Sequence, residues 1–124
     1  MHGFRSAPAA AIAVILFSAS FAVADPAADL KPALGNTIVS THPDGRKARL
    51  WLKPDGTFSA EGRAGNRSSG VWKLKGDKLC LTERKPMAIP LAYCRVFPRE
   101  TVGKPWPDIA VNGDHVTNEI VAHP

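Results

Sequence analysis

Histidine is the side chain in this sequence best suited to chemistry near neutral pH, because imidazole can act as a base or bind a metal ion. Asp114 directly precedes His115, and His123 follows near the end of the sequence. These three could form a metal site, but zinc ligands usually come in tighter pairs such as H-x3-H. His42 lies in a His-Pro-Asp-Gly turn, where polar residues are common. For Asp114, His115 and His123 we therefore predict exposed turn and tail residues, with no metal ion and no other cofactor.

Hydrolytic chemistry requires a base beside a nucleophile, or a pair of carboxylates in a cleft. The Ser and Thr residues lie in short β-like runs and turns, with no G-x-S-x-G motif. The stretch GRAGNRSSG (62–70) has neither the Gly-Lys-Ser/Thr nor the following helix of a phosphate-binding P-loop. We predict no catalytic residues and a protein that is not an enzyme.

Two tryptophans are candidates for ligand binding. Trp51 alternates with Lys47, Arg49 and Lys53, so these four side chains share one face of a strand. An indole among cations can stack on a ligand or bind an anionic group; alternatively, the Lys and Arg stems cover it. Trp106 stands between two prolines in VGKPWPD (102–108), where it either caps one end of the fold or projects as a recognition residue.

Cys80 and Cys94 are the two cysteines of the chain. In an oxidising compartment, two cysteines this close most simply pair with each other. Closing a loop of about 15 residues would stabilise the fold by ~3 kcal/mol. A redox-active or metal-bound thiol is the alternative, but neither cysteine is in a C-x-x-C motif and no histidine is near either one.

Residues 1–24 have the pattern of a secretory signal peptide. Arg5 precedes the apolar stretch AAAIAVILFSASFAVA, which ends in the small-x-small sequence Ala22-Val23-Ala24 that signal peptidase requires. A membrane anchor is the alternative, but the stretch is shorter than the roughly 20 residues of a spanning helix, and no second apolar run follows. We predict cleavage before Asp25 and a periplasmic or secreted monomer without a membrane span.

The charge of the chain is a mild excess of cations. Removal of residues 1–24 takes away one cation, Arg5, and no acid, so fifteen Lys and Arg remain against eleven Asp and Glu, a net charge of +4. The charges are interspersed and not gathered in a block, as on an ordinary solvated surface. We therefore predict no nucleic-acid partner.

The sequence after Gly35 alternates short β-like runs with turn residues at intervals of about ten residues. Gly, Pro, Asp and Asn between the runs favour tight turns, and such turns bring each strand back antiparallel beside its predecessor. The expected runs are NTIVST (36–41), RKARLWL (46–52), TFSAE (57–61), SGVWKL (69–74), KLCLTE (78–83) and LAYCRVF (91–97). A last strand is expected after Asp114. The fold class is therefore predicted as all-β, a small antiparallel meander that closes into a barrel or half-barrel.

Alternation along the runs predicts which side chains are buried. Ala48, Leu50 and Leu52 face opposite to Lys47, Arg49, Trp51 and Lys53. One apolar face should contain Trp72, Leu74, Leu79, Leu81, Tyr93 and Phe97. Cys80 and Cys94 then fall on compatible faces of two adjacent strands.

Five short motifs follow one another along the chain: Asp55-Gly56-Thr57, Gly70-x-Trp72, Gly76-Asp77-x-Leu79-Cys80, Tyr93-Cys94 and Gly103-x-x-Trp106. As a set they resemble a group of small exported bacterial proteins, the lipocalin-like domains of unknown function found in alphaproteobacteria. The resemblance covers roughly residues 34–112. It implies an antiparallel calycin- or lipocalin-like barrel or half-barrel with one disulfide and no established activity.

A second, more local resemblance concerns WKLKGDKLCL (72–81), which is similar to a segment of the periplasmic metalloprotease inhibitors. In that family an N-terminal arm occupies the protease cleft. Here the stretch DPAADLKPALG (25–35) precedes the β domain, and its residues 25–34 could form such a flexible arm or only a loose terminus. We therefore expect a signal peptide (1–24), an arm (25–34) and a β domain (35–124). The expected function is binding of a small ligand or an envelope or protein partner, with protease inhibition as the alternative.

Overall fold

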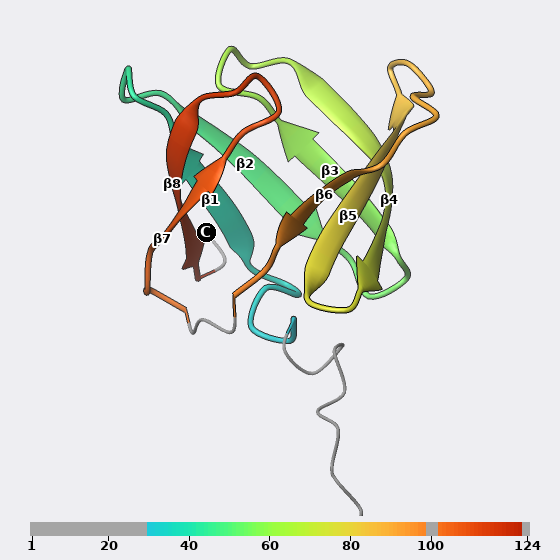
Figure 1. Cartoon of the computed structure of the whole chain (residues 1–124), viewed down its shortest axis with the longest axis horizontal. Coiled ribbons are helices and arrows are strands. Elements are labelled where there is room, and N and C mark those ends of the chain that lie inside the picture. The colour runs from blue at the N-terminus through green and yellow to red at the C-terminus, as the bar shows by residue number, and fades with distance from the viewer. Residues whose placement is uncertain (1–29, 99–101, 123–124) are drawn as a thin grey trace, which may run out of the picture.

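The computed structural model describes residues 30–98 and 102–122, which form eight antiparallel β-strands (Figure 1). Residues 1–24 of the predicted signal peptide, residues 25–29 of the predicted arm, and His123 lie outside the described residues. The described residues contain no helix long and apolar enough to cross a membrane. The prediction of an all-β fold is confirmed. In chain order the strands are β1 (Thr37–Thr41), β2 (Lys47–Leu52), β3 (Thr57–Glu61), β4 (Arg67–Lys75), β5 (Lys78–Lys85), β6 (Tyr93–Val96), β7 (Trp106–Ile109) and β8 (His115–Val121).

The turns form where Gly and Asp supply the local geometry. In the two Pro-Asp-Gly turns, Gly45 has a φ of 85° and Gly56 a φ of 90°, values that glycine adopts without a steric penalty. Asp55 closes its turn by accepting hydrogen bonds from the backbone N–H and the hydroxyl of Thr57, at 2.9 and 2.6 Å. Asp44 accepts a similar bond from the backbone N–H two residues further on. Each short turn returns the chain beside the strand that it has just left.

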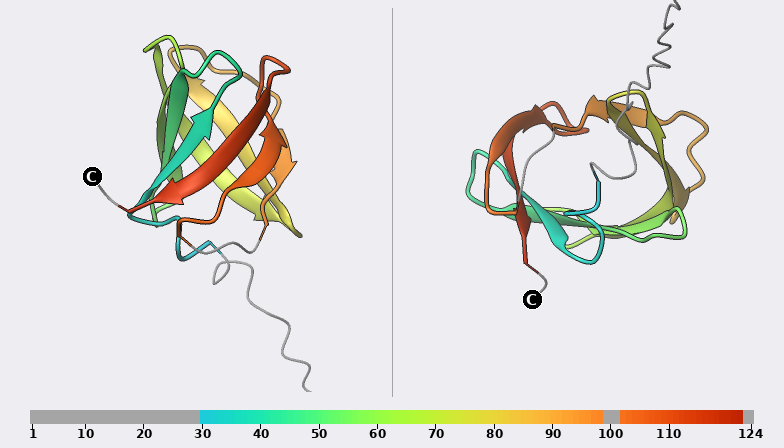
Figure 2. Two further views of the ribbon diagram at one scale, coloured as in Figure 1. Left: turned by 90° about the vertical axis from the view of Figure 1, so that its left-hand side faces the viewer. Right: turned by 90° about the horizontal axis from the view of Figure 1, so that it is seen from below.

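The sheet curls into a barrel because β1 pairs with both β2 and β8. The strand order is β6-β5-β4-β3-β2-β1-β8-β7, with every pair antiparallel. β6 and β7 are thus the two ends of the sheet, and Figure 2 shows them next to each other in the barrel wall. Among the described residues no backbone ladder joins them. The barrel is closed except at this boundary, which we call the β6–β7 seam.

Side-chain contacts bridge the β6–β7 seam. The guanidinium Nε of Arg95 donates to Asp108 Oδ1 at 2.6 Å. The Tyr93 hydroxyl donates to a backbone carbonyl at the end of β7 at 2.7 Å. At the end of the seam nearer the core, the rings of Phe97 and Trp106 meet edge to face with their centroids 5.5 Å apart.

Strands β5 and β6 are also linked covalently. Their register places Cys80 opposite Cys94, and the two form the predicted disulfide. A disulfide is consistent with an oxidising, exported compartment. The predicted apolar face is also found: Leu79 is in the core, and four of the other predicted members, Trp72, Leu74, Leu81 and Phe97, pack against it.

The core occupies one half of the barrel, at the end where the chain enters. Its buried members are Leu30, Ala33, Ile38, Leu52, Phe58, Leu79, Trp106 and Ile120. Phe58 lies opposite Gly70 in the neighbouring strand, where a Cβ would overlap a backbone carbonyl of β5 and come within 2.9 Å of the Phe58 ring. Gly70 therefore provides the room that this large ring needs.

Residues 30–34 fill this end of the barrel. The prediction of a flexible arm over residues 25–34 therefore does not hold for these five residues. The predicted arm includes residues 30–34, but Leu30 is only 1 % exposed and Ala33 is fully buried. The chain folds back here in a tight turn, in which Ala33 N–H donates to Leu30 O at 2.8 Å. Burial of apolar surface holds the turn in place, because Leu30 contacts the core and not solvent. We call residues 30–34 the plug.

Candidate functional site: the barrel cavity and its mouth

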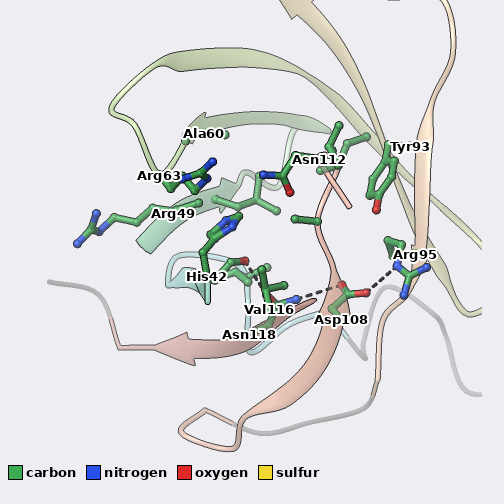
Figure 3. A pocket seen from close by; sticks show the side chains of 18 of the residues that line it. His42, Arg49, Ala60, Arg63, Tyr93, Arg95, Asp108, Asn112, Val116 and Asn118 are labelled. Atoms are coloured by element: carbon green, nitrogen blue, oxygen red, sulfur yellow. Dashed lines mark hydrogen bonds and ion pairs between the residues drawn. The ribbon is translucent and has the colours of Figure 1, made fainter. Parts of the chain in front are cut away.

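The half of the barrel beyond the core is hollow. A cavity of about 610 Å³ occupies it and is lined by residues from all eight strands (Figure 3). The cavity extends to the turns at 42–46, 62–66 and 110–114, at the end opposite the plug, and we call this end the mouth. The structure thus has one end filled by the plug and core, and one end where the cavity reaches the loops.

Small inward-facing side chains create this hollow half. Ser40 pairs with Ala48 in neighbouring strands, and Ala60 pairs with Ser68 on the next two. All four residues line the cavity. Towards the plug the inward positions of the same strands carry Ile38, Leu50, Leu52 and Phe58, which fill the space. The change from large to small side chains along β1 to β3 is therefore what leaves a cavity in a barrel of this strand number.

A polar cluster lies in the wall near the seam. Asn118 is buried; it accepts a hydrogen bond from the Ser40 hydroxyl at 2.5 Å and donates from Nδ2 to Asp108 Oδ2 at 3.1 Å. Asp108 also receives the Arg95 guanidinium, and this hydrogen bond is the main reason why the pKa of Arg95 is raised above its ordinary value. Burial raises the pKa of the neighbouring Tyr93. The cluster presents a paired charge and a phenol to the cavity, and both the oxygen and the nitrogen of the Asn118 amide are hydrogen-bonded.

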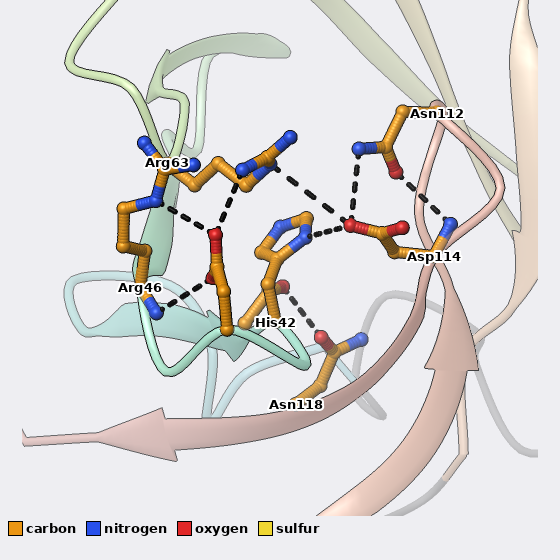
Figure 4. A network of polar contacts seen from close by, with 8 residues as sticks. His42, Arg46, Arg63, Asn112, Asp114 and Asn118 are labelled. Atoms are coloured by element: carbon orange, nitrogen blue, oxygen red, sulfur yellow. Dashed lines mark hydrogen bonds and ion pairs between the residues drawn. The ribbon is translucent and has the colours of Figure 1, made fainter.

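Charged residues from three turns meet at the mouth (Figure 4). His42 Nδ1 lies 3.0 Å from Asp114 Oδ2, and this hydrogen bond is the largest of the causes that lower the pKa of Asp114. Arg63 Nη1 donates to Asp44 Oδ2 at 3.0 Å, and its Nε lies 3.9 Å from Asp114 Oδ2. Arg46 also donates to Asp44, at 2.8 Å. The network therefore ties the β1–β2, β3–β4 and β7–β8 turns together around the opening.

The His42–Asp114 pair has the geometry of a base with its orienting carboxylate, but it lacks a nucleophile. Among the described residues, no Ser, Thr or Cys side chain is hydrogen-bonded to His42, and the nearby Ser40 donates to Asn118 instead. Nor does the described part of the chain hold a group of three His, Cys, Asp or Glu side chains that could bind a metal ion. His115, which was predicted to be an exposed residue and not a metal ligand, is exposed. The pair's evident role is to fasten two turns.

The predicted binding residues on β2 lie on the outside of the barrel. Trp51 is half-buried, and its indole N–H donates to Thr37 Oγ1 at 2.9 Å. Lys47 and Lys53 are exposed, and the Arg49 guanidinium points away from the cavity (Figure 3). The four predicted residues are thus together on one face. Lys47, Trp51 and Lys53 are separate from the cavity, whereas Arg49 is among the residues that line it. Ligand binding by this face stays a prediction.

Trp106, the other predicted binding residue, lies inside. It is 7 % exposed, packs in the core against Phe97, and forms part of the cavity lining. Of its two predicted roles, the structure fits the cap at the filled end of the barrel. Its strand, β7, follows Pro105 directly and contains Pro107, so no strand was expected here.

Several residues of the site were missed by sequence reasoning. Arg95 lies between Tyr93 and Phe97 in an alternating run, so the pattern that placed those two inside also placed Arg95 inside. Asn118 lies in the same way between Val116 and Ile120. A charged or amide side chain at a position that the alternation places inside the barrel was therefore a signal that could have identified Arg95 and Asn118. Pairing of His42 with Asp114 had no such signal, because 72 residues separate them.

Comparison of the chain with protein-family models, with curated proteins and with solved structures finds no significant match. The resemblances to lipocalin-like exported proteins and to metalloprotease inhibitors therefore stay predictions. The fold and the site geometry carry the functional argument.

Proposed function

We propose that this protein is an exported, non-enzymatic binding protein that holds one small, largely apolar organic molecule in its barrel cavity. The observation that carries the proposal is the cavity of about 610 Å³. Ligand pockets are typically clefts of about 300–1,000 Å³, lined mainly by apolar side chains with a few polar groups. Eight-stranded barrels have interiors wide enough either for packed side chains or for one small ligand.

A ligand is a better explanation for the cavity than imperfect packing. Protein interiors pack about as densely as organic crystals, and voids much larger than a water molecule are few. Here the space results from a consistent choice of Ser and Ala at Ser40, Ala48, Ala60 and Ser68, while the other half of the same barrel is densely filled. One larger side chain at either alanine would close much of it.

Polar groups in the lining suggest how such a ligand is oriented. Glu83 lines the cavity on β5, next to Gly70 on β4, which has no side chain. In the described part of the chain the Glu83 carboxylate has no ion pair and no side-chain hydrogen bond. It is therefore free to accept a hydrogen bond from a ligand, or to pair with a ligand amine. Leu50, Ala60 and Leu81 supply apolar contact surface.

The proposal is tested with an apolar fluorescent probe, N-phenyl-1-naphthylamine, whose emission rises on transfer from water to an apolar site. The wild-type protein should bind it saturably at one site. Ala48→Phe and Ala60→Phe should each weaken binding at least tenfold, because the new ring occupies the cavity. Thr117→Phe, on the exposed side of β8, is the matched control and should bind as the wild type does.

Circular dichroism and thermal unfolding must first establish that the three variants fold. Absence of saturable binding, or equal binding by both cavity variants and the control, would overturn the proposal. Mass spectrometry of an organic extract of the purified protein then identifies the natural ligand. Protease inhibition through the arm is less well supported, since residues 30–34, the described part of the predicted arm, are packed into the filled end of the barrel.

A further inference from the structure

The loop between β5 and β6 is an exposed apolar segment. Residues 86–92 read Pro-Met-Ala-Ile-Pro-Leu-Ala, with no polar side chain among them. Met87 is 65 % exposed, Ile89 42 % and Leu91 79 %. Single exposed apolar residues are common on protein surfaces, whereas three large ones within five residues mark an interaction surface.

The shape of the loop fits a broad partner surface. Figure 1 shows it extending beyond the strands at the end of the barrel where the β1–β2, β3–β4 and β7–β8 turns also lie, and Figure 2 shows it standing out from the wall. Val111, in the β7–β8 turn at this end, is also exposed.

The backbone of the loop has a reduced number of free N–H donors, which lowers the cost of transferring it out of water. Pro86 and Pro90 have no N–H group, and the N–H of Ile89 donates to Glu83 O at 3.0 Å. Three of the seven loop residues therefore present no free donor. Unpaired backbone donors are the main cost of moving an irregular segment into an apolar medium, so this cost is reduced here.

Cations stand at the base of the loop. Arg84 and Lys85 immediately precede it, and both are exposed. Between Arg84 and Ala92 there is no acidic residue. Positive charge beside an apolar tip complements a surface that is anionic outside and apolar beneath, which is the arrangement of an anionic phospholipid bilayer.

We propose that the β5–β6 loop docks this protein on anionic phospholipid bilayers, with Met87, Ile89 and Leu91 inserted at the level of the lipid headgroups and upper acyl chains. Arg84 and Lys85 then contact lipid phosphates. Docking in this way turns the mouth of the barrel towards the bilayer. The inference goes beyond ligand binding and does not depend on it, since a barrel that binds no probe could still dock.

Co-sedimentation with sucrose-loaded vesicles tests the proposal. The wild type should bind vesicles of equal parts phosphatidylglycerol and phosphatidylcholine. The triple variant M87S/I89S/L91S should lose roughly a thousandfold or more in partition coefficient, because each of the three large apolar side chains contributes about tenfold or more when it leaves water. The control V102S/V121S removes two exposed apolar side chains outside the loop and should bind normally.

The charge contribution has its own matched pair of variants. R84Q/K85Q should weaken binding roughly fivefold for each charge removed, since one cation near an anionic membrane contributes about 1 kcal/mol. K75Q/K78Q, at the β4–β5 turn on the opposite end of the barrel, should have little effect. Binding to pure phosphatidylcholine should be weak. Raising the salt to about 1 M, where the Debye length is ~3 Å, should weaken binding to anionic vesicles.

Depth of insertion separates docking from simple surface adsorption. In L91W, brominated lipids should quench the new indole on vesicle binding, beyond the change in wild-type protein with its three tryptophans. Three results would overturn the proposal: no binding to anionic vesicles, equal binding by the triple variant and the control, or no additional quenching. A wild-type dimer that the triple variant converts to a monomer would show instead that a second copy covers the loop.

Discussion

Truncation of Leu30 to alanine tests whether the plug is an integral part of the fold. Leu30 is almost fully buried among core residues from several strands. Removing its isobutyl methyl and methine groups loses about 2.4 kcal/mol of transfer free energy at ~0.8 kcal/mol per carbon. The void left behind adds a further cost of ~24 cal/mol per Å³ where the core does not relax. We expect the free energy of unfolding to fall by about 3 kcal/mol.

Urea unfolding followed by tryptophan fluorescence measures this change, because Trp106 is buried in the same core. With a slope of ~1.5 kcal/mol/M, a loss of about 3 kcal/mol lowers the midpoint by roughly 2 M. Lys31→Ala, in the same turn but exposed, is the control and should change stability by less than about 0.5 kcal/mol. If Leu30→Ala behaved like Lys31→Ala, residues 30–34 would be a loose terminus and the plug would not exist.

Three further perturbations have definite expected outcomes. Replacing Cys80 and Cys94 together by serine should lower the free energy of unfolding by about 3 kcal/mol, because the bond closes a loop with a sequence separation of 14, and a reductant should then have no further effect. Asp114→Asn should flatten the acid side of the stability–pH profile. The pKa of Asp114 is held below its ordinary value of 3.8, chiefly by the hydrogen bond from His42, so its contribution is present above 3.8 and is lost as the pH falls through the folded-state value. A profile that is equally steep in the variant would contradict this. Gly70→Ala should cost about 1–3 kcal/mol in urea unfolding, since its side-chain carbon would overlap a backbone carbonyl of β5; an unchanged midpoint would mean that the strands separate easily there.

The sequence was most informative where structure depends on neighbours along the chain. The period of two placed Leu79 and Leu81 inward, and the hairpin between β5 and β6 brought Cys80 opposite Cys94. Both inferences need only local alternation and a turn. The same logic predicted the antiparallel meander, because short Gly- and Asp-containing turns leave few other routes for the chain.

Strand β7 was missed because prolines usually exclude a strand. The structure resolves this conflict by placing β7 at the end of the sheet. Pro107 pairs with Thr117 of β8 in register, while the other edge of β7 faces the seam, where no ladder requires an N–H donor. Edge positions are where proline is tolerated in sheets. Which strand lies at the edge is a property of the closed barrel and not of the segment itself.

The cavity and the mouth network depend on tertiary closure, which no local pattern specifies. Pairing of β1 with β8 brings His42 beside Asp114, and the same closure encloses the small side chains of Ala48 and Ala60. In the sequence these alanines look like ordinary strand residues. The plug was missed for a related reason: two buried residues in one short turn give no periodicity, and their burial depends on an open barrel end.

The β6–β7 seam is the boundary at which the barrel should open most easily. Along the seven paired boundaries, parting two strands breaks a row of main-chain hydrogen bonds, but between β6 and β7 it breaks two side-chain hydrogen bonds and a ring contact. The disulfide holds β6 to β5, so we expect β7 to be the strand that moves when the seam opens. Sub-global opening of the seam, without unfolding, then gives the cavity a second route to solvent beside the mouth, and amide hydrogens of β7 should exchange faster than those of β4, which is paired on both sides.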